Sequence, residues 1–236
     1  MYSIQQNIEQ VTNQIRIAEN KCCRIENSVQ LLAVSKTKPN QAIEEAIAAG
    51  QLHFGENYPQ EGVEKVRHFS QHDKASQLVW HFIGPIQSNK TRQIAEHFDW
   101  VHSIDRNKTA QRLNDQRPDT LPPLQVLIQV NTSGESSKSG INESEIFQLA
   151  ELISSLPNLT LRGLMSIPAN VSDYSSQLAA FSQLAKLKDR LAESYPNIDT
   201  LSMGMTGDME AAIKAGSTIV RIGTAIFGAR DYSKKS

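Results

Sequence analysis

The apolar residues of the chain follow two spacings that take turns along the sequence. Short apolar runs, such as residues 124–130, are typical of strands buried on both faces. Longer segments, such as residues 173–194, place apolar residues three and four positions apart, which predicts amphipathic helices with one face toward a core. Because a helical segment follows each short run, we expect strands and helices to alternate.

From the first expected strand onward, strands and helices alternate, and one further helix precedes that strand. The expected strands are 30–36, 52–56, 78–83, 100–104, 124–130, 159–165, 200–202 and 217–222. The expected helices are 3–20, 41–49, 60–68, a helix capped by Ser88 or Asn89 that runs to about Phe98, 106–115, 142–155, 173–194 and 208–215. The segment after Phe227 supplies a last, short helical piece.

This alternation predicts the fold class, α/β with a parallel sheet and helices outside it. Eight units within about 200 residues fit a closed (β/α)8 TIM-type barrel, with the first helix as an extra N-terminal element. The alternative is an open, doubly wound sheet, but the glycine fingerprint G-x-G-x-x-G is absent after the first strand. No repeat, linker or low-complexity tract divides the chain, so we expect residues 1–236 to form a single domain.

Composition narrows the function classes. Of the 236 residues, 39% are hydrophobic and 21% are charged, the balance of an ordinary soluble protein. The formal net charge is −1 without clusters of one sign, which argues against a surface for nucleic acid or an anionic membrane.

The cysteines and the N-terminus bear on the compartment. Cys22 and Cys23 are adjacent and could close a disulfide only with strain, so we expect reduced thiols. Residues 1–10 lack the basic and apolar regions of a signal peptide, and no apolar run approaches membrane-spanning length. We therefore expect a cytoplasmic protein, and we expect it to be monomeric.

The first expected strand ends in a lysine. The apolar run Leu31–Val34 leads through Ser35 to Lys36, and Pro39 then forces a break before the next helix. A lysine at the end of a buried strand loses hydration, which favours the neutral amine that can form a Schiff base with a carbonyl. The same stretch is also compatible with a surface lysine in a turn.

The last two expected strands end in residues suited to a phosphate. Ser202 and Thr224 offer hydroxyls, and Gly223 offers a backbone N–H beside the last helical piece. In a (β/α)8 barrel, phosphate sites commonly follow strands seven and eight, although each glycine taken singly is more often a simple turn. Arg221 lies in an apolar run, where a buried cation needs a partner, either in the barrel mouth or as a helix carboxylate on the outer face.

A Schiff-base lysine, a phosphate cradle and a buried cation around one ring of strand ends suggest pyridoxal 5′-phosphate as the ligand. Several motifs then make a family resemblance specific. They are Ala33–Pro39, Phe54–Tyr58, His81–Gly84 with Gln87–Lys90, Leu201–Met205 and Val220–Gly228. In order and spacing, over nearly the whole chain, they resemble the pyridoxal phosphate homeostasis protein family, which is itself similar to the N-terminal barrel of alanine racemase.

The resemblance implies a role for each matching residue. By it, Lys36 carries the cofactor as an internal aldimine, and Arg221 faces the pyridine nitrogen. The remaining cofactor-binding residues it implies are Asn57 on the ring side and Ser202, Gly223 and Thr224 at the phosphate. Thr206 stands where many relatives have serine, a departure that keeps the hydroxyl.

The resemblance also favours a carrier over an enzyme. An arginine opposite the ring nitrogen disfavours a protonated pyridinium and weakens the electron sink. In alanine racemase the second base is a tyrosine of a further domain, and we expect that domain to be missing because the chain ends at Ser236. We therefore expect a protein that buffers or carries the cofactor, with apo-enzymes that depend on it as possible recipients. The alternatives are an amino-acid racemase or related Schiff-base enzyme, and a sugar-phosphate aldolase or isomerase.

Two weaker features complete the list of candidates. The loop 131–140 with Lys138 could make a transient second contact to the cofactor, although a solvated loop is equally compatible. His68 and His72 are four residues apart on a helix end, but with no third ligand in view we expect a solvated face and no metal site.

Overall fold

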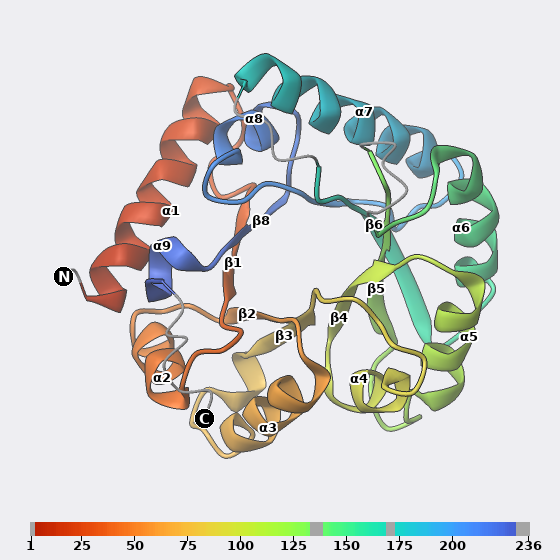
Figure 1. Ribbon diagram of the computed structural model, residues 1–236, viewed down its shortest axis with the longest axis horizontal. Helices are drawn as coiled ribbons and strands as arrows, with labels where there is room; N and C mark the ends of the chain where they lie inside the picture. Colours follow the sequence, from red (N-terminus) through yellow and green to blue (C-terminus); the bar gives the residue numbers. More distant parts are fainter. Residues whose placement is uncertain (1–2, 133–138, 169–172, 230–236) are drawn as a thin grey trace.

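Eight parallel strands close into a barrel in sequence order, and β1 pairs with β8 (Figure 1). The computed structural model describes residues 3–132, 139–168 and 173–229. The strands are β1 (Gln30–Val34), β2 (His53–Glu56), β3 (Val79–Phe82), β4 (Trp100–Ile104), β5 (Leu124–Gln129), β6 (Leu159–Met165), β7 (Thr200–Ser202) and β8 (Ile219–Ile222). The predicted (β/α)8 barrel is confirmed.

The helices form a ring outside the strands. They are α1 (Ile4–Lys21), α2 (Asn40–Ala48), α3 (Pro59–Phe69), α4 (Thr91–His97), α5 (Asn107–Gln116), α6 (Ile146–Ser154), α7 (Tyr174–Ala192), α8 (Met209–Lys214) and α9 (Thr224–Phe227). Two 3-10 turns, η1 (Ala75–Gln77) and η2 (Glu143–Glu145), precede β3 and α6. No helix in these ranges combines the length and the apolar character that crossing a membrane requires.

The extra N-terminal helix completes the outer ring. Among the described residues after β8, which end at 229, the chain forms one helix, the four-residue α9, and this helix is too short to cover the strands beside it. Helix α1 lies along this gap in Figure 1 and buries Ile8, Val11 and Ile15. The Asn7 side chain donates a 2.9 Å hydrogen bond to the Ile226 carbonyl of α9. The first helix therefore takes the place of a full-length eighth helix.

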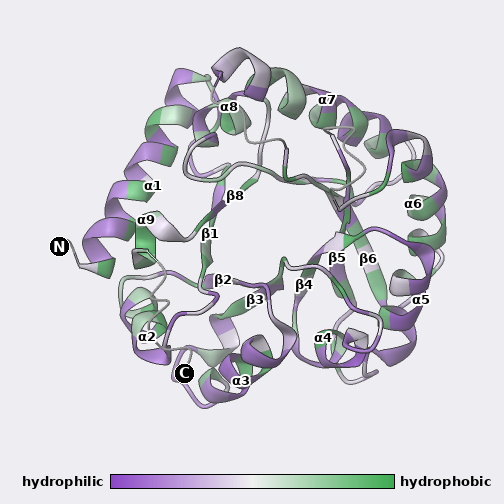
Figure 2. Ribbon diagram, in the orientation of Figure 1, coloured by the Kyte–Doolittle hydropathy of each residue, from purple (hydrophilic) through white to green (hydrophobic). Residues whose placement is uncertain are grey.

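Two apolar clusters stabilise the barrel. The larger one fills the layer between strands and helices, where the helices turn their hydrophobic positions inward (Figure 2). The smaller one, Leu32, Ile83 and Ile219 with Val34 packed against them, lies inside the barrel. Several polar side chains are buried as well, among them His81, His102, Ser202 and Arg221.

Several boundaries differ from the prediction. The last helical piece, α9, ends at Phe227, whereas the prediction placed it after that residue. Three further differences have a clear local cause. β1 ends at Val34 rather than at residue 36, because Thr37 adopts a positive φ of 63° that no strand contains. β8 begins at Ile219 rather than at residue 217, where the Ser217 hydroxyl lies within hydrogen-bond distance of the carbonyls of Met203 and Ile219. Helix α4 begins at Thr91 behind Lys90 without a side-chain cap, so the expected cap at Ser88 or Asn89 is wrong.

Candidate functional site

A pocket of about 300 Å³ opens at the C-terminal ends of the strands, the end at which (β/α)8 barrels place their sites. The residues that line it come from the loops and strand ends of β1, β2, β3, β6, β7 and β8. They are Val34, Lys36, Asn57, Ile83, Ile167, Met205, Thr206, Gly207, Arg221, Gly223 and Thr224. The pocket is mixed in character, with apolar walls and a few polar groups, as small-molecule sites usually are.

The structure brings five of the six predicted site residues to this pocket: Lys36, Asn57, Arg221, Gly223 and Thr224. The sixth, Ser202, is fully buried below it, and its hydroxyl contacts Arg221 and His102 instead of the pocket.

The apolar lining residues were not predicted as site residues. Val34 shares the inward face of β1 with Leu32, so the two-residue period of the strand could have identified it. Ile167 and Met205 lie in loops without a repeating pattern, and the sequence carries no such signal for them.

Lys36 lies in a turn that is fixed from behind by a buried ionic cluster. The Lys65 ammonium donates to the carbonyl of Ser35 at 2.8 Å and to the Glu56 carboxylate at 2.8 Å. Glu56 also accepts a 2.6 Å bond from the Ser35 hydroxyl, and Glu61 accepts from both Lys65 and the backbone N–H of Thr37. Both neighbours of Lys36 are thus tied to α3 and β2, which leaves the half-buried lysine side chain to the pocket.

A second lysine joins this turn to the other side of the pocket. The Lys38 ammonium donates to the backbone carbonyls of Phe227, Gly228 and Ala229 at 2.9–3.0 Å. These carbonyls belong to the last residue of α9 and to the two residues after it, and cations favourably satisfy the last carbonyls of a helix. Lys38 therefore fixes α9, whose first residue is Thr224, relative to the turn that carries Lys36.

The turn from β8 into α9 supplies uncharged donors. Thr224 is the first residue of α9, so its backbone N–H has no partner within the helix and its hydroxyl lies at the pocket. Gly223 packs so closely on β1 that an added Cβ would lie 3.2 Å from the carbonyl oxygen of Val34. This pair is suited to accept phosphate oxygens.

Arg221 extends from β8 across the floor of the pocket. Its Nη1 donates to the carbonyl and hydroxyl oxygens of Ser202 at 2.6 and 2.7 Å, and its Nη2 donates to the Ser166 carbonyl at 2.9 Å. Burial lowers the pKa of Arg221 to about 10, against which the nearby Asp208 carboxylate acts, so the guanidinium keeps its charge at neutral pH. An arginine has five N–H donors, and the described residues accept from three of them, which leaves two that a ligand in the pocket can use.

Asn57 carries a polar atom that the described part of the chain does not satisfy. Its Oδ1 is buried and has no hydrogen-bond partner among those residues, although the side chain lines the pocket. A buried acceptor of this kind costs free energy until a donor reaches it. A ligand with a hydroxyl or a similar donor on its ring side would satisfy Asn57.

The two histidines considered as weaker candidates do not line this pocket. His68 faces Glu44 at 3.5 Å, and His72 accepts a hydrogen bond from the Lys74 amide. Across residues 3–132, 139–168 and 173–229 no three suitable side chains converge in a way that could hold a metal ion. Lys138 and most of its loop lie outside the described residues.

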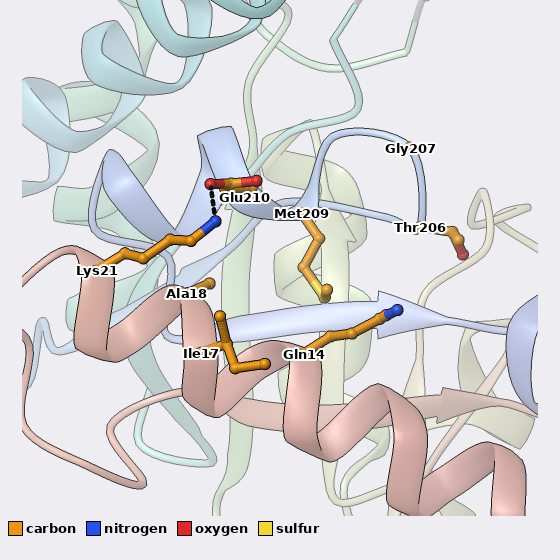
Figure 3. Close-up of a pocket in the computed structure, with 8 residues that line it drawn as sticks. All are labelled: Gln14, Ile17, Ala18, Lys21, Thr206, Gly207, Met209 and Glu210. Atoms are coloured by element: carbon orange, nitrogen blue, oxygen red, sulfur yellow. Dashed lines mark hydrogen bonds and ion pairs between the residues drawn. The ribbon is translucent and has the colours of Figure 1, made fainter.

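A cavity of about 360 Å³ lies between α1 and the segment before α8 (Figure 3). It shares Thr206 and Gly207 with the pocket at the strand ends, but its charged residues, Lys21 and Glu210, pair with each other at 3.1 Å. Because those groups are satisfied and exposed, size alone does not make this cavity the functional site.

Known proteins resemble the chain over its full length. A family model for the alanine racemase N-terminal domain matches residues 6–231. The pyridoxal phosphate homeostasis protein of Vibrio alginolyticus is 73% identical over 233 residues, which cover 99% of this chain and 100% of that protein. The protein of the same name from Escherichia coli K12 is 60% identical over 235 residues, which cover all of both chains. The solved structure of PipY from Synechococcus elongatus with PLP bound is 34% identical, with a TM-score of 0.82, and the match covers 96% of this chain and 100% of PipY.

Proposed function

The chain belongs to the pyridoxal phosphate homeostasis protein family, and on this premise we propose that it binds pyridoxal 5′-phosphate on Lys36 and serves to buffer or deliver it. The arrangement that carries the proposal is the placement of Lys36 and the Gly223–Thr224 turn around one pocket. An amine that can attach an aldehyde and an uncharged phosphate cradle together match the two ends of this cofactor.

The other lining residues fit the rest of the cofactor. Arg221 has donors left for a ring nitrogen, which accepts a hydrogen bond only when it is unprotonated. The buried Oδ1 of Asn57 requires a donor, and Val34 and Ile83 offer apolar surface for the ring faces. Each polar group of the ligand thus has a candidate partner.

Attachment requires only groups that the pocket contains. In its unprotonated form, the Lys36 amine would hold the aldehyde through a carbon–nitrogen double bond, with its two protons and the aldehyde oxygen released as water. Hydrolysis of that bond would return the lysine amine and the aldehyde. A protein that performs these two steps can store the cofactor and hand it to apo-enzymes that require it.

The pocket favours storage over turnover. Bound pyridoxal phosphate supplies an electron sink, whose strength depends on a protonated ring nitrogen. The Arg221 cation disfavours that proton. Among the lining residues that the structure describes, Lys36 and Arg221 are the only groups with a charge to offer, so a second acid or base for the opposite face of a substrate is lacking there.

An absorbance spectrum of the purified protein, before and after borohydride reduction, tests attachment. We expect a near-visible band that borohydride removes, with the cofactor fixed to a peptide containing Lys36. Lys36→Ala should lose the band, and the exposed Lys108→Ala should keep it. A band that persists in Lys36→Ala would refute the proposed attachment.

Turnover and delivery separate the carrier from an enzyme. The loaded protein should restore activity to an apo-enzyme faster than the cofactor dissociates from the loaded protein on dilution without the apo-enzyme. Incubation with a panel of chiral amino acids should leave each enantiomer unchanged. Racemisation of any of them by wild type but not by Lys36→Ala would favour the racemase alternative.

A further inference from the structure

Three histidines form a continuous chain inside the barrel, below the pocket. His102 Nδ1 lies 2.8 Å from the Ser202 hydroxyl, His102 Nε2 lies 2.9 Å from His81 Nδ1, and His81 Nε2 lies 3.1 Å from His53 Nδ1. His81 and His102 are buried, whereas His53 is half-buried. The chain starts at the residue that holds Arg221 and crosses the interior through β4 and β3 to β2.

The arginine at one end determines the direction of every bond in this chain. A guanidinium can only donate, so the Ser202 hydroxyl accepts from Arg221 Nη1 at 2.7 Å. The hydroxyl proton of this fully buried serine then has His102 Nδ1 as its acceptor among the described residues. His102 must therefore carry its own proton on Nε2, where it donates to His81 Nδ1. By the same argument His81 carries its proton on Nε2 and donates to His53.

The surroundings keep the chain neutral. Burial lowers the pKa of His81 and His102 well below the usual value, and the Arg221 charge adds to the effect on His102. The Trp100 ring stacks on His81 with the ring centroids 5.5 Å apart, which adds to the apolar surroundings of that imidazole. A bridging metal does not fit either, because two nitrogens bound to one ion at about 2.0–2.1 Å each cannot lie as close as these in a tetrahedral site.

We propose that His102, His81 and His53 are positioning residues, which form a one-way hydrogen-bond chain through Ser202 that fixes the Arg221 guanidinium toward the ring nitrogen of the ligand. This inference deepens the proposed function and rests on it for the identity of the ligand. Without an acceptor at His102 Nδ1, the serine hydroxyl loses its fixed direction, and the guanidinium loses one of the bonds that set its angle to the pocket. Within the chain, only the Nε2-protonated form of each histidine satisfies all partners.

The first test is the protonation site of each histidine in the ligand-free, full-length protein, read from ¹⁵N chemical shifts. We expect Nε2–H for His102 and His81 in wild type. In Ser202→Ala the link to Arg221 is absent, so a measurable share of the Nδ1–H form should appear at His102. An Nδ1–H form at His102 in wild type, or no change in Ser202→Ala, would overturn the imposed direction. This test needs no cofactor, so it can fail while the proposed function holds, and the reverse is also possible.

The second test replaces His102 in two ways and measures the bound cofactor. In His102→Asn the amide oxygen can take the place of Nδ1 and still accept from Ser202, whereas His102→Leu has no acceptor. We expect His102→Leu to bind pyridoxal phosphate about tenfold more weakly, as the loss of one hydrogen bond to a charged network implies, with a shifted absorption maximum. His102→Asn should remain near wild type in both. Equal behaviour of the two folded variants would refute a positioning role, and if His102→Leu does not fold, the wild-type tautomers decide.

Discussion

Lys65 donates a 2.8 Å hydrogen bond to the backbone carbonyl of Ser35, the residue directly before Lys36. Lys65 is itself buried, and its other partners are the carboxylates of Glu56 and Glu61. A buried ionic cluster is costly to form, but it is directional, and here every member bonds to the turn that carries Lys36. The cluster accounts for how an exposed turn can hold Lys36 in one place.

Replacing Lys65 by Met should destabilise the protein and loosen that turn. The substitution leaves the buried Glu56 carboxylate without its cation, a change that typically costs about 3–5 kcal/mol. We expect a lower urea midpoint and a smaller fraction of protein that forms the absorbance band. The double variant Lys65→Met/Glu56→Gln should recover part of the stability because the stranded charge is gone. A double variant no more stable than Lys65→Met would contradict this account.

Gly84→Ala should disturb Asn57. An added Cβ at Gly84 would lie 2.1 Å from the backbone oxygen of Asn57, far inside contact distance, so one of the two loops must move. We expect a loss of about 1–3 kcal/mol in unfolding free energy, as overpacking usually costs, together with weaker cofactor binding. Gly207→Ala is the control for stability, because an added Cβ there meets nothing within 4 Å. Equal unfolding midpoints for the two variants would show that the loops accommodate the added Cβ without loss of stability, which would contradict the prediction.

Stability should fall as the solution becomes acidic through the range of histidine titration. Burial lowers the pKa of His53, and more strongly that of His81 and His102, below the value of about 6.5 that they regain on unfolding. The unfolded chain then binds more protons than the native one below that pH, so the stabilising contribution is complete above about pH 7 and is lost on acidification, by up to about 1.4 kcal/mol per histidine and pH unit.

Urea unfolding between about pH 7.5 and pH 5.5 measures this slope. Wild type should lose stability more steeply than His81→Leu, which has one of the three groups removed. Burial raises the pKa of the Glu56 carboxyl, which acts in the opposite direction, so the comparison between the two proteins is the decisive quantity. Parallel slopes would mean that His81 is not held neutral.

Lys38→Met should weaken the cofactor site while leaving most of the barrel unchanged. The ammonium bonds to three carbonyls at the C-terminal end of α9 and just after it, and its loss frees the segment that presents Gly223 and Thr224. We expect about tenfold weaker binding of pyridoxal phosphate, measured by equilibrium dialysis, and a near-native unfolding midpoint. Lys108→Met, at an exposed position, serves as the control. Unchanged binding in Lys38→Met would show that the bonds of Lys38 to the end of α9 do not contribute to cofactor binding.

The sequence was sufficient for the barrel because its signals are local. Apolar runs and helical spacing appear within single elements, and the known geometry of parallel barrels then groups the strand ends. The same geometry predicts that Lys36, Arg221 and Thr224 lie close together, and all three line the pocket. It did not show the bonds of Ser202 to His102 and Arg221, because a strand pattern indicates that a side chain points inward but not which residue its hydroxyl bonds to.

The histidine chain was beyond sequence reasoning for a related physical reason. His53, His81 and His102 belong to neighbouring strands, but their contacts depend on the register between β2, β3 and β4 and on rotamers that a buried polar interior selects. Lys65 is a similar case. Its place on α3 is consistent with a solvated lysine, and only the packing of α3 against β2 shows that it is buried.

The bonds of Lys38 join residues that lie 189 to 191 positions apart. Lys36 beside β1 and the Gly223–Thr224 turn after β8 thus come from opposite ends of the sequence, and they meet where β1 pairs with β8 and closes the ring of strands. In the proposed function the ligand would contact both sides of that junction, and a ligand that binds only the closed barrel stabilises it. Loading with pyridoxal phosphate should therefore slow the opening of the barrel between β1 and β8.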